Sequence, residues 1–465
     1  MEPMLTKATE PIKGERTEAI EKSWLDTSLS LFTDVRAGEG AGALLLAANV
    51  FSLLAFYSVL KVVREALILS EGGAVVKSYA AAGQALLLLV FVPAYGAFAS
   101  RVNRLRLVCG VTLFFASHLI VFYLLGSSGV RVGVAFYLWI GIFNLVVIAQ
   151  FWGFANDLYS PDRGKRLFPF VGLGASLGAA VGSGLTVALA EVGAYRLMLV
   201  AAVGLLIPVL LTLWVNRREG RLQPSKSASG EAPLSNEGGF KLVLSQRYLL
   251  LIALLMVVLN LVNTLGEFQL GSLIESEAVQ QVNPGAADTS ALTETQRASA
   301  RLAITHMSGT VQTSVNILGL LFQAFLVSRV FKYLGVRGAI FILPFIALGS
   351  YGLIALFPVF SIVRVAKVLE NSTDYSIQNT ARQALFLPTS REAKYKAKQA
   401  IDSFFVRAGD MLQAGVVYIG VQLALGIRQY AVVNVVLVGV WLLLAVGIAR
   451  EHKKLVPVEV EKAAA

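Results

Sequence analysis

The chain has 465 residues, of which 56% are hydrophobic and 15% are charged, and its mean hydropathy is +0.68. Apolar runs of about 20 residues recur along its length, which excludes an ordinary soluble domain and indicates a polytopic α-helical membrane protein. The net charge of +11 predicts no nucleic acid partner, because Lys and Arg collect in the loops on one side of a membrane. The single cysteine excludes an intrachain disulfide, and the three histidines lack the spacing of metal ligands.

The first 40 residues form a polar segment, which we expect to be a cytoplasmic tail. It mixes acidic and basic residues and lacks the apolar core of a signal peptide. Apolar residues within it share one helical face, namely Trp24, Leu25, Leu29, Phe32 and Val35. They predict either a short helix on the membrane surface or a solvated tail.

Twelve segments that can cross a bilayer follow the tail. They cover residues 42–70, 76–98, 105–127, 131–157, 168–192, 196–216, 247–272, 303–327, 337–357, 358–386, 397–425 and 429–449. The expected fold is therefore all-α, with twelve transmembrane helices.

Basic residues distinguish the two sides of the membrane. They cluster after spans 2, 4, 6, 8 and 10, as at Arg101, Arg166 and Arg218, whereas the alternate loops hold few. By the positive-inside rule both termini are expected to be cytoplasmic, in a bacterial inner membrane. The acidic and polar loop 273–302 is expected to face outside.

An internal repeat divides the chain into halves. Two short matches recur with one common offset, Ser100-Arg101-Val102 as Ser328-Arg329-Val330, and Arg163 with Arg166 as Arg391 with Lys394. This predicts six-helix halves at 41–216 and 247–449, a Ser/Gly/Pro-rich cytoplasmic linker at 217–246, and a cytoplasmic tail at 450–465. Two such halves are the major facilitator plan, in which substrate binds near the midplane between halves that rock.

Span 1 carries three charged residues near its end. Lys61 and Glu65 are four residues apart and are predicted to pair, which leaves Arg64 to point inward. The alternative is that all three extend to the membrane interface.

Span 5 contains Gly174, Gly178 and Gly182, a repeated small-xxx-small pattern. It predicts a seam where another helix packs closely. It is not a phosphate-binding loop, because no strand precedes it and no Gly-Lys-Ser/Thr follows.

Further polar residues lie in spans 7, 8 and 11. They are Asn260, Asn263, Thr264, Glu267, Gln312, Asn316, Asp402, Arg407 and Asp410. Such groups join helices as often as they bind ligands. The sequence holds no nucleophile–base pair and no nucleotide-hydrolysis motif, so we expect neither an enzyme nor a cofactor.

Span 10 carries the most unusual pattern in the chain. Six polar residues lie within a stripe roughly 80° wide if each residue advances by about 100°; they are Arg364, Lys367, Asn371, Asp374, Gln378 and Arg382. The stripe runs about 27 Å, close to the hydrocarbon thickness of a bilayer. Charges facing lipid are costly, so the stripe predicts either a network of salt bridges between helices or a substrate path. Three of the six residues are cationic, which favours an anionic solute.

Several stretches resemble the nucleotide transporter family of bacterial intracellular parasites and plastids, the ATP/ADP antiporters distinct from the mitochondrial carrier. They are YSVLKVVRE at 57–65, FWGFAN at 151–156, KRLF at 165–168, NLVN at 260–263, Arg382 with Leu387-Pro388, and KAKQAID at 396–402. The resemblance covers most of residues 45–425. It implies a twelve-span major facilitator variant whose members exchange ATP for ADP or take up nucleotides with protons.

The resemblance carries over to the charged residues unevenly. The family's essential basic residues, Lys in well-known members, fall on Arg64 and Arg382. The family's span 7 glutamate falls on Asn263, and no acid occurs at 140–144, where its span 4 glutamate falls. Two signature charges are thus absent, although Glu267, one turn from Asn263, can substitute for one. These absences put strict ATP/ADP exchange in doubt more than the binding of an anion.

The first hypothesis is a nucleotide transporter that acts as a monomer in the lipid bilayer. Its expected phosphate-binding cations are Lys61, Arg64, Arg364, Lys367 and Arg382, with Asn263, Asn371 and Asp374 completing the substrate site. Glu65, Glu267, Glu370 and Asp402 are expected to couple ions or balance charge.

Two alternatives remain open. The first is a proton- or cation-coupled transporter of another organic anion. The second is a membrane adaptor without transport activity, whose binding surface is the tail or the 273–302 loop.

Overall fold

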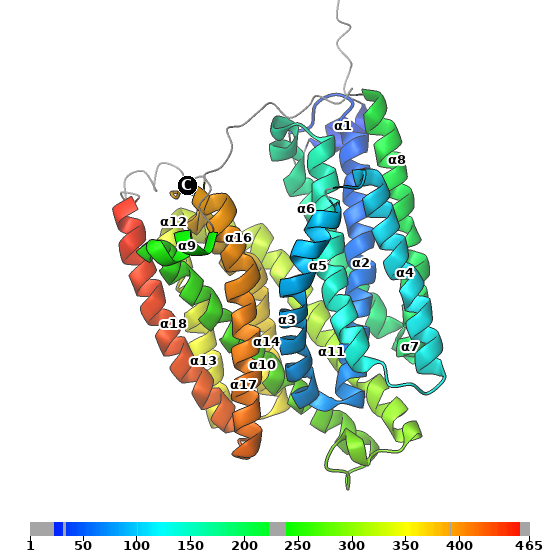
Figure 1. Cartoon of the computed structure of the whole chain (residues 1–465), viewed down its shortest axis with the longest axis vertical. Helices are drawn as coiled ribbons and strands as arrows, with labels where there is room; N and C mark the ends of the chain where they lie inside the picture. The colour runs from blue at the N-terminus through cyan, green and yellow to red at the C-terminus, as the bar shows by residue number, and fades with distance from the viewer. Residues whose placement is uncertain (1–22, 31–33, 100, 223–238, 391, 456–465) are drawn as a thin grey trace, which may run out of the picture.

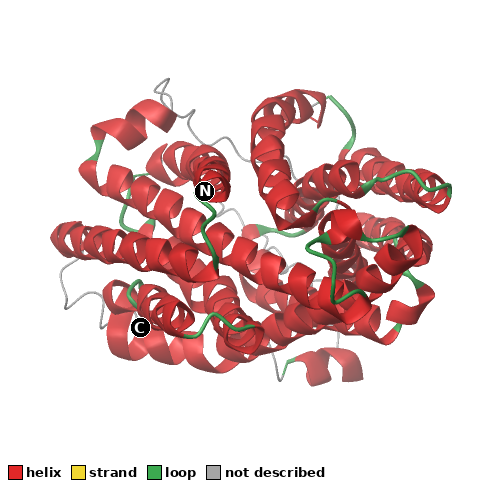
Figure 2. Cartoon of the chain, turned by 90° about the horizontal axis from the view of Figure 1, so that it is seen from below, coloured by secondary structure: helices red, strands yellow, loops and turns green. Residues whose placement is uncertain are grey.

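The computed structural model describes residues 23–30, 34–99, 101–222, 239–390 and 392–455. Within these ranges all regular secondary structure is helical (Figure 2), as the composition predicts. Ten helices are long and apolar enough to cross a membrane. The shorter apolar helix α13 (Ile342–Leu356) and a polar helix at 360–385 complete the expected twelve spans.

The N-terminal half consists of a short surface helix and six spans. They are α1 (Trp24–Leu29), then α2 (Gly40–Glu71), α3 (Gly73–Ala99), α4 (Arg104–Ser127), α5 (Gly133–Leu158), α6 (Pro161–Ala188), and α7 (Ala194–Gly204) with α8 (Leu206–Leu222) as the sixth span. The sixth span is interrupted near Leu205 because Pro208 has no amide hydrogen and its ring crowds the carbonyl of Gly204.

The C-terminal half repeats this arrangement with less regular helices. It begins with the short helix α9 (Gly239–Ser245) and the span α10 (Arg247–Val282); the next continuous helix is made of α11 (Glu294–Leu321), η3 (Phe322–Leu326) and α12 (Val327–Ala339). After α13, the polar helix is made of α14 (Phe360–Thr373), η4 (Asp374–Gln378) and α15 (Asn379–Leu385). The last two helices are η5 (Ala393–Ala397), α16 (Lys398–Ala400), η6 (Ile401–Phe405) and α17 (Val406–Gln422) in one continuous run, and then α18 (Ile427–Leu455). The segments η3 to η6 are π-helical turns. Each π turn adds a residue to its turn and shifts the helix faces beyond it.

The two halves stand side by side, and α11 of the C-terminal half packs against α2 and α6 of the N-terminal half (Figure 1). One end of the molecule carries α1, the last turn of α18, the end of α8 and the start of α9; we call it the linker end, because the segment between residues 222 and 239 joins the halves there. The opposite end carries the loop 283–293, and we call it the loop end. The loop is shorter than the expected 273–302, since α10 extends to Val282 and a capping box at Thr293 starts α11 early.

The glycine pattern of span 5 packs α6 directly against the backbone of α2. A Cβ atom added to Gly174, Gly178 or Gly182 would lie 2.5, 2.2 or 2.0 Å from carbonyl oxygens of α2. Only glycine permits this approach, so the predicted packing seam is confirmed. It fixes α2, which carries Lys61 and Arg64, at a defined distance from α6.

The helix α1 is tied to the start of α2. Asp26 is buried and accepts hydrogen bonds from the amides of Gly38 and Gly40, and it forms a capping box with Ser23. Burial opposes ionisation of Asp26, but these hydrogen bonds outweigh it and lower its pKa to about 2. Trp24 and Leu29 lie in the expected short helix, whereas Phe32 lies outside the described residues.

Candidate functional site

A cavity of about 280 Å³ lies between the halves. The N-terminal half lines it with residues of α2, α3 and α5, and the C-terminal half with residues of α10, α11, α14, η4 and α17. Its position matches the midplane site of the major facilitator plan.

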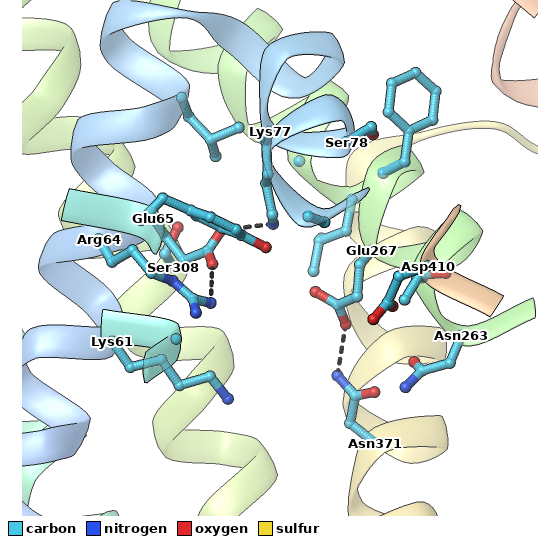
Figure 3. Close-up of a pocket in the computed structure, with 18 of the residues that line it drawn as sticks. Lys61, Arg64, Glu65, Lys77, Ser78, Asn263, Glu267, Ser308, Asn371 and Asp410 are labelled. Atoms are coloured by element: carbon cyan, nitrogen blue, oxygen red, sulfur yellow. Dashed lines mark hydrogen bonds and ion pairs between the residues drawn. The ribbon is translucent and has the colours of Figure 1, made fainter. Parts of the chain in front are cut away.

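The N-terminal wall of the cavity is cationic. Lys61 and Arg64 on α2 and Lys77 on α3 face the cavity together with Glu65 (Figure 3). Glu65 binds the guanidinium of Arg64 at 2.6 Å and the ammonium of Lys77 at 2.5 Å. The Arg64 guanidinium also lies over the ring of Tyr137, 4.5 Å from its centroid. Three cations therefore face one carboxylate on this wall.

Lys61 differs from the other two cations. Among the residues that the structure describes, no carboxylate lies within 4.0 Å of its ammonium group. Its nearest described aromatic contact is the Tyr375 ring, 5.7 Å away across the cavity. The predicted pair between Lys61 and Glu65 is wrong, because Arg64 and Lys77 occupy the Glu65 carboxylate instead.

The C-terminal wall carries more acid than base. Glu267 and Asp410 line the cavity with Arg407. Glu267 accepts a hydrogen bond from the Asn371 amide at 2.8 Å, and Asp410 pairs with Arg407 at 3.2 Å. Asn263, which stands where the resemblance expects glutamate, also lines the cavity, and Glu267 supplies a carboxylate one turn further along α10.

Lys367 is buried behind this wall rather than in the cavity. Its side chain is 0% exposed and lies 3.1 Å from Glu370 and 3.5 Å from Glu267. It also donates to the Asn263 side-chain oxygen at 2.7 Å, while Tyr351 donates to Glu370 at 2.7 Å. Lys367 and Glu370 thus form a buried network that holds Asn263 and Glu267 in place.

Four other residues singled out from the sequence do not line the cavity. Arg364 is exposed near the start of α14, and its guanidinium lies over the Phe360 ring. Arg382 donates to Asn379 on its own helix α15. Asp374 begins the π turn η4, and Asp402 pairs with Lys398 at 3.0 Å.

The π turn changes the helix face on which the part of the polar stripe beyond Asp374 lies. The extra residue in η4 rotates everything beyond it by about 100° relative to an uninterrupted α-helix. Asn371, before the turn, reaches the cavity, whereas Arg382, after it, does not. The assumption of about 100° per residue throughout span 10 therefore overestimated the length of the polar stripe.

Lys77 is a cavity residue that the sequence interpretation missed. It stands at the start of an apolar span, where a lysine resembles an ordinary boundary residue. The spacing in sequence carries no signal that Lys77 shares a carboxylate with Arg64. Only the packing of α3 against α2 reveals this contact.

Polar contacts join the two halves at the loop end. Arg301 of α11 donates to Ser70 at 3.0 Å and lies 3.6 Å from Glu71 at the end of α2. The turn after α2 contributes as well, because the amide of Ala74 donates to Glu275 of α10 at 2.8 Å. A side chain at Gly73, which has a positive φ of 75°, would collide with that carboxylate.

The family model for the TLC ATP/ADP transporter matches residues 134–452. The chain is also similar to a chloroplastic ADP,ATP carrier protein of Arabidopsis thaliana, with 25% identity over 277 residues, or 56% of this chain. That alignment spans 43% of the length of the chloroplast protein, less than half of it.

Solved structures similar to this chain are transporters. An inward-facing bacterial homologue of ferroportin has a TM-score of 0.61 at 11% identity, covering 88% of this chain and 98% of its own. An inward-facing, unoccupied bacterial homologue of the lysosomal transporter Spinster has a TM-score of 0.54 at 16% identity, covering 90% and 98%. The nucleoside transporter NupG has a TM-score of 0.53 at 14% identity, covering 88% and 98%.

These likenesses show the fold alone, and it is the two-bundle transporter fold expected from the repeat. The family match covers more than half of the chain, including every span of the C-terminal half. The chain belongs to the TLC ATP/ADP transporter family.

Proposed function

We propose that this protein carries nucleotides across a membrane by alternating access. The observation that carries the proposal is the group of three cations, Lys61, Arg64 and Lys77, on one wall of a cavity between the halves. Arg and Lys bind phosphate oxygens through charge-assisted hydrogen bonds. Membership of a family described by ATP/ADP transport makes a nucleotide phosphate the best candidate for the anion.

The two kinds of cation suit different parts of a polyphosphate. The planar guanidinium of Arg64 offers paired donors to two oxygens of one phosphate, whereas the ammonium groups of Lys61 and Lys77 act as compact point charges. The tyrosine rings near the cations, Tyr137 and Tyr375, offer flat apolar surfaces to a base or a ribose. The whole cavity comes from one chain, which supports transport by a monomer.

We further propose that the linker end faces the cytoplasm. Basic residues gather there, as at Arg104, Arg163, Arg166 and Arg218, which favours that side by the positive-inside rule. The contacts of Arg301 and Glu275 join the halves at the loop end, from which we infer that substrate enters this state from the linker end. The conformational change that opens the loop end requires these contacts to break.

Uptake into proteoliposomes tests the proposed function. Purified protein is reconstituted, vesicles are loaded with unlabelled ADP or left empty, and labelled ATP is added outside. Uptake that needs internal ADP identifies an exchanger, and uptake into empty vesicles identifies net transport. Vesicles shown to be sealed that take up no ATP in either case would contradict the proposal.

A second candidate, the transport of another organic anion, is favoured by one observation. Asn263 and Asn144 are neutral amides in the cavity at or near the places where the resemblance expects glutamates. Amide groups donate and accept hydrogen bonds without charge, so they change which neutral parts of a substrate fit. Competition of labelled ATP uptake by a panel of nucleotides, sugar phosphates and dicarboxylates separates the two candidates.

A further inference from the structure

Glu65 lies where an anionic substrate group would bind. Its two carboxylate oxygens are divided between Arg64 of α2, at 2.6 Å, and Lys77 of α3, at 2.5 Å (Figure 3). The three side chains are 13%, 16% and 12% exposed for Arg64, Glu65 and Lys77. The carboxylate therefore uses donors that line the cavity and that a phosphate group also needs.

The other two carboxylates that line the cavity are engaged differently. Glu267 is held by Asn371 and Lys367, and Asp410 by Arg407 and Asn260, all within the C-terminal half. Neither has an ion pair with the cationic wall among the described residues. Glu65 is thus the cavity carboxylate that neutralises the cations of the N-terminal half.

We propose that Glu65 is an internal counter-anion, which occupies the phosphate-binding donors of the empty carrier and is displaced when substrate binds. The proposal rests on the proposed function, because it assumes that the substrate anion binds at Arg64 and Lys77. A carboxylate and a phosphate group both accept charge-assisted hydrogen bonds from Arg and Lys. The two anions therefore compete for the same cations.

This role predicts two opposite effects of removing the charge. Without the Glu65 carboxylate, substrate no longer displaces a competitor, and binding becomes tighter. The empty cavity, however, then holds cations without a counter-ion, and closing a low-dielectric site around unpaired charge is costly. The return of the empty carrier is therefore slowed more than the return of the loaded carrier.

A residue that only positions Arg64 and Lys77 behaves in the opposite way. Its loss leaves both cations free to turn away from the cavity, which weakens binding. The sign of the change in affinity thus separates a counter-anion from a positioning residue.

The experiment measures ATP binding to purified protein by isothermal titration calorimetry. For Glu65→Gln we expect the Kd for ATP to fall about tenfold. Glu65→Asp keeps the charge on a shorter side chain and is expected to fall between wild type and Glu65→Gln, which keeps the test available if Glu65→Gln does not fold. Asp157→Asn removes the same charge outside the cavity, where Asp157 pairs with Arg104 at 2.9 Å, and we expect it to change the Kd by less than about threefold.

Transport gives the second measurement. Uptake of labelled ATP into ADP-loaded vesicles, divided by uptake into empty vesicles, is expected to rise about tenfold in Glu65→Gln. Weaker or unchanged ATP binding by both Glu65 variants would overturn the counter-anion role while leaving the proposed function intact. An equal tightening in Asp157→Asn would also overturn it, because a general loss of negative charge would then explain the effect. Wild-type protein that binds no ATP would overturn both proposals.

Discussion

The two halves use their cations in different ways, although they share one plan. The N-terminal half presents Lys61, Arg64 and Lys77 to the cavity, whereas the C-terminal half buries Lys367 between Glu267 and Glu370. A lysine in a transmembrane helix is therefore not by itself evidence of a substrate site. What matters is whether the cation reaches the cavity: Lys61 lines it, whereas Lys367 is 0% exposed between two carboxylates.

The corresponding helix contacts differ as well. In the N-terminal half α6 meets α2 through glycines and backbone carbonyls. In the C-terminal half α17 meets α10 at one glycine, Gly409, where an added Cβ would lie 2.8 Å from the carbonyl oxygen of Val257. Polar groups add to this contact, since Asn260 donates to the carbonyl of Val406 and to Asp410, both at 2.7 Å. Close backbone packing leaves little freedom, while polar bridges and π turns allow adjustment. The C-terminal half thus combines a single glycine contact with polar bridges and π turns, whereas the N-terminal half uses three glycines in a row of turns.

The largest effect is expected from replacing Lys367, because its loss leaves two carboxylates without their shared counter-ion. Breaking a buried ion pair costs about 3–5 kcal/mol. We expect Lys367→Met to lower the midpoint of thermal unfolding in detergent strongly. In Lys61→Met the midpoint should stay nearly unchanged while ATP binding weakens by at least about tenfold. Similar stability losses in both variants would contradict the assignment of a structural role to one lysine and a binding role to the other.

The next effect separates two arginines that the family resemblance treats alike. A hydrogen bond to a charged group contributes about 1.5–3 kcal/mol, so Arg64→Ala is expected to weaken ATP binding by roughly 10- to 100-fold. Arg382 does not line the cavity, and Arg382→Ala is expected to reduce the uptake rate while changing the Kd less than about threefold. Calorimetry and vesicle uptake on the same preparations measure both quantities. An equal loss of binding in the two variants would mean that Arg382 also contacts the substrate.

A smaller effect is expected at the glycine seam. The Cβ of Gly178→Val would lie 2.2 Å from the carbonyl oxygen of Phe51, so α6 must move away from α2. Overpacking of this kind costs about 1–3 kcal/mol. Gly172→Ala on the same helix meets nothing within 4 Å and serves as the control, with no loss of stability expected. If both variants unfold at the wild-type temperature, the seam does not hold the N-terminal half together.

Much of the fold could be predicted because each span is a run of apolar residues and the seam is a regular spacing of glycines. The site was predicted only in part. Lys61, Arg64 and Asn371 reach the cavity, but the phase of span 10 changes at the π turn that begins at Asp374, and no residue pattern announces that turn. Partner choice was also hidden, because Glu65 pairs with its sequence neighbour Arg64 and with Lys77 on the next helix rather than with Lys61 one turn away along α2.

The positions of α1 and of the last turn of α18 make the proposed rocking of the halves measurable by spectroscopy. Asp26 fastens α1 to the start of α2, so a probe at the exposed Trp24 moves with the N-terminal half, whereas a probe at Leu455 moves with α18 of the other half. Both sites lie at the linker end, and the chain contains one native cysteine, Cys109, which is easily replaced before new cysteines are introduced. The distance between two spin labels at these sites is expected to change each time the linker end opens or closes.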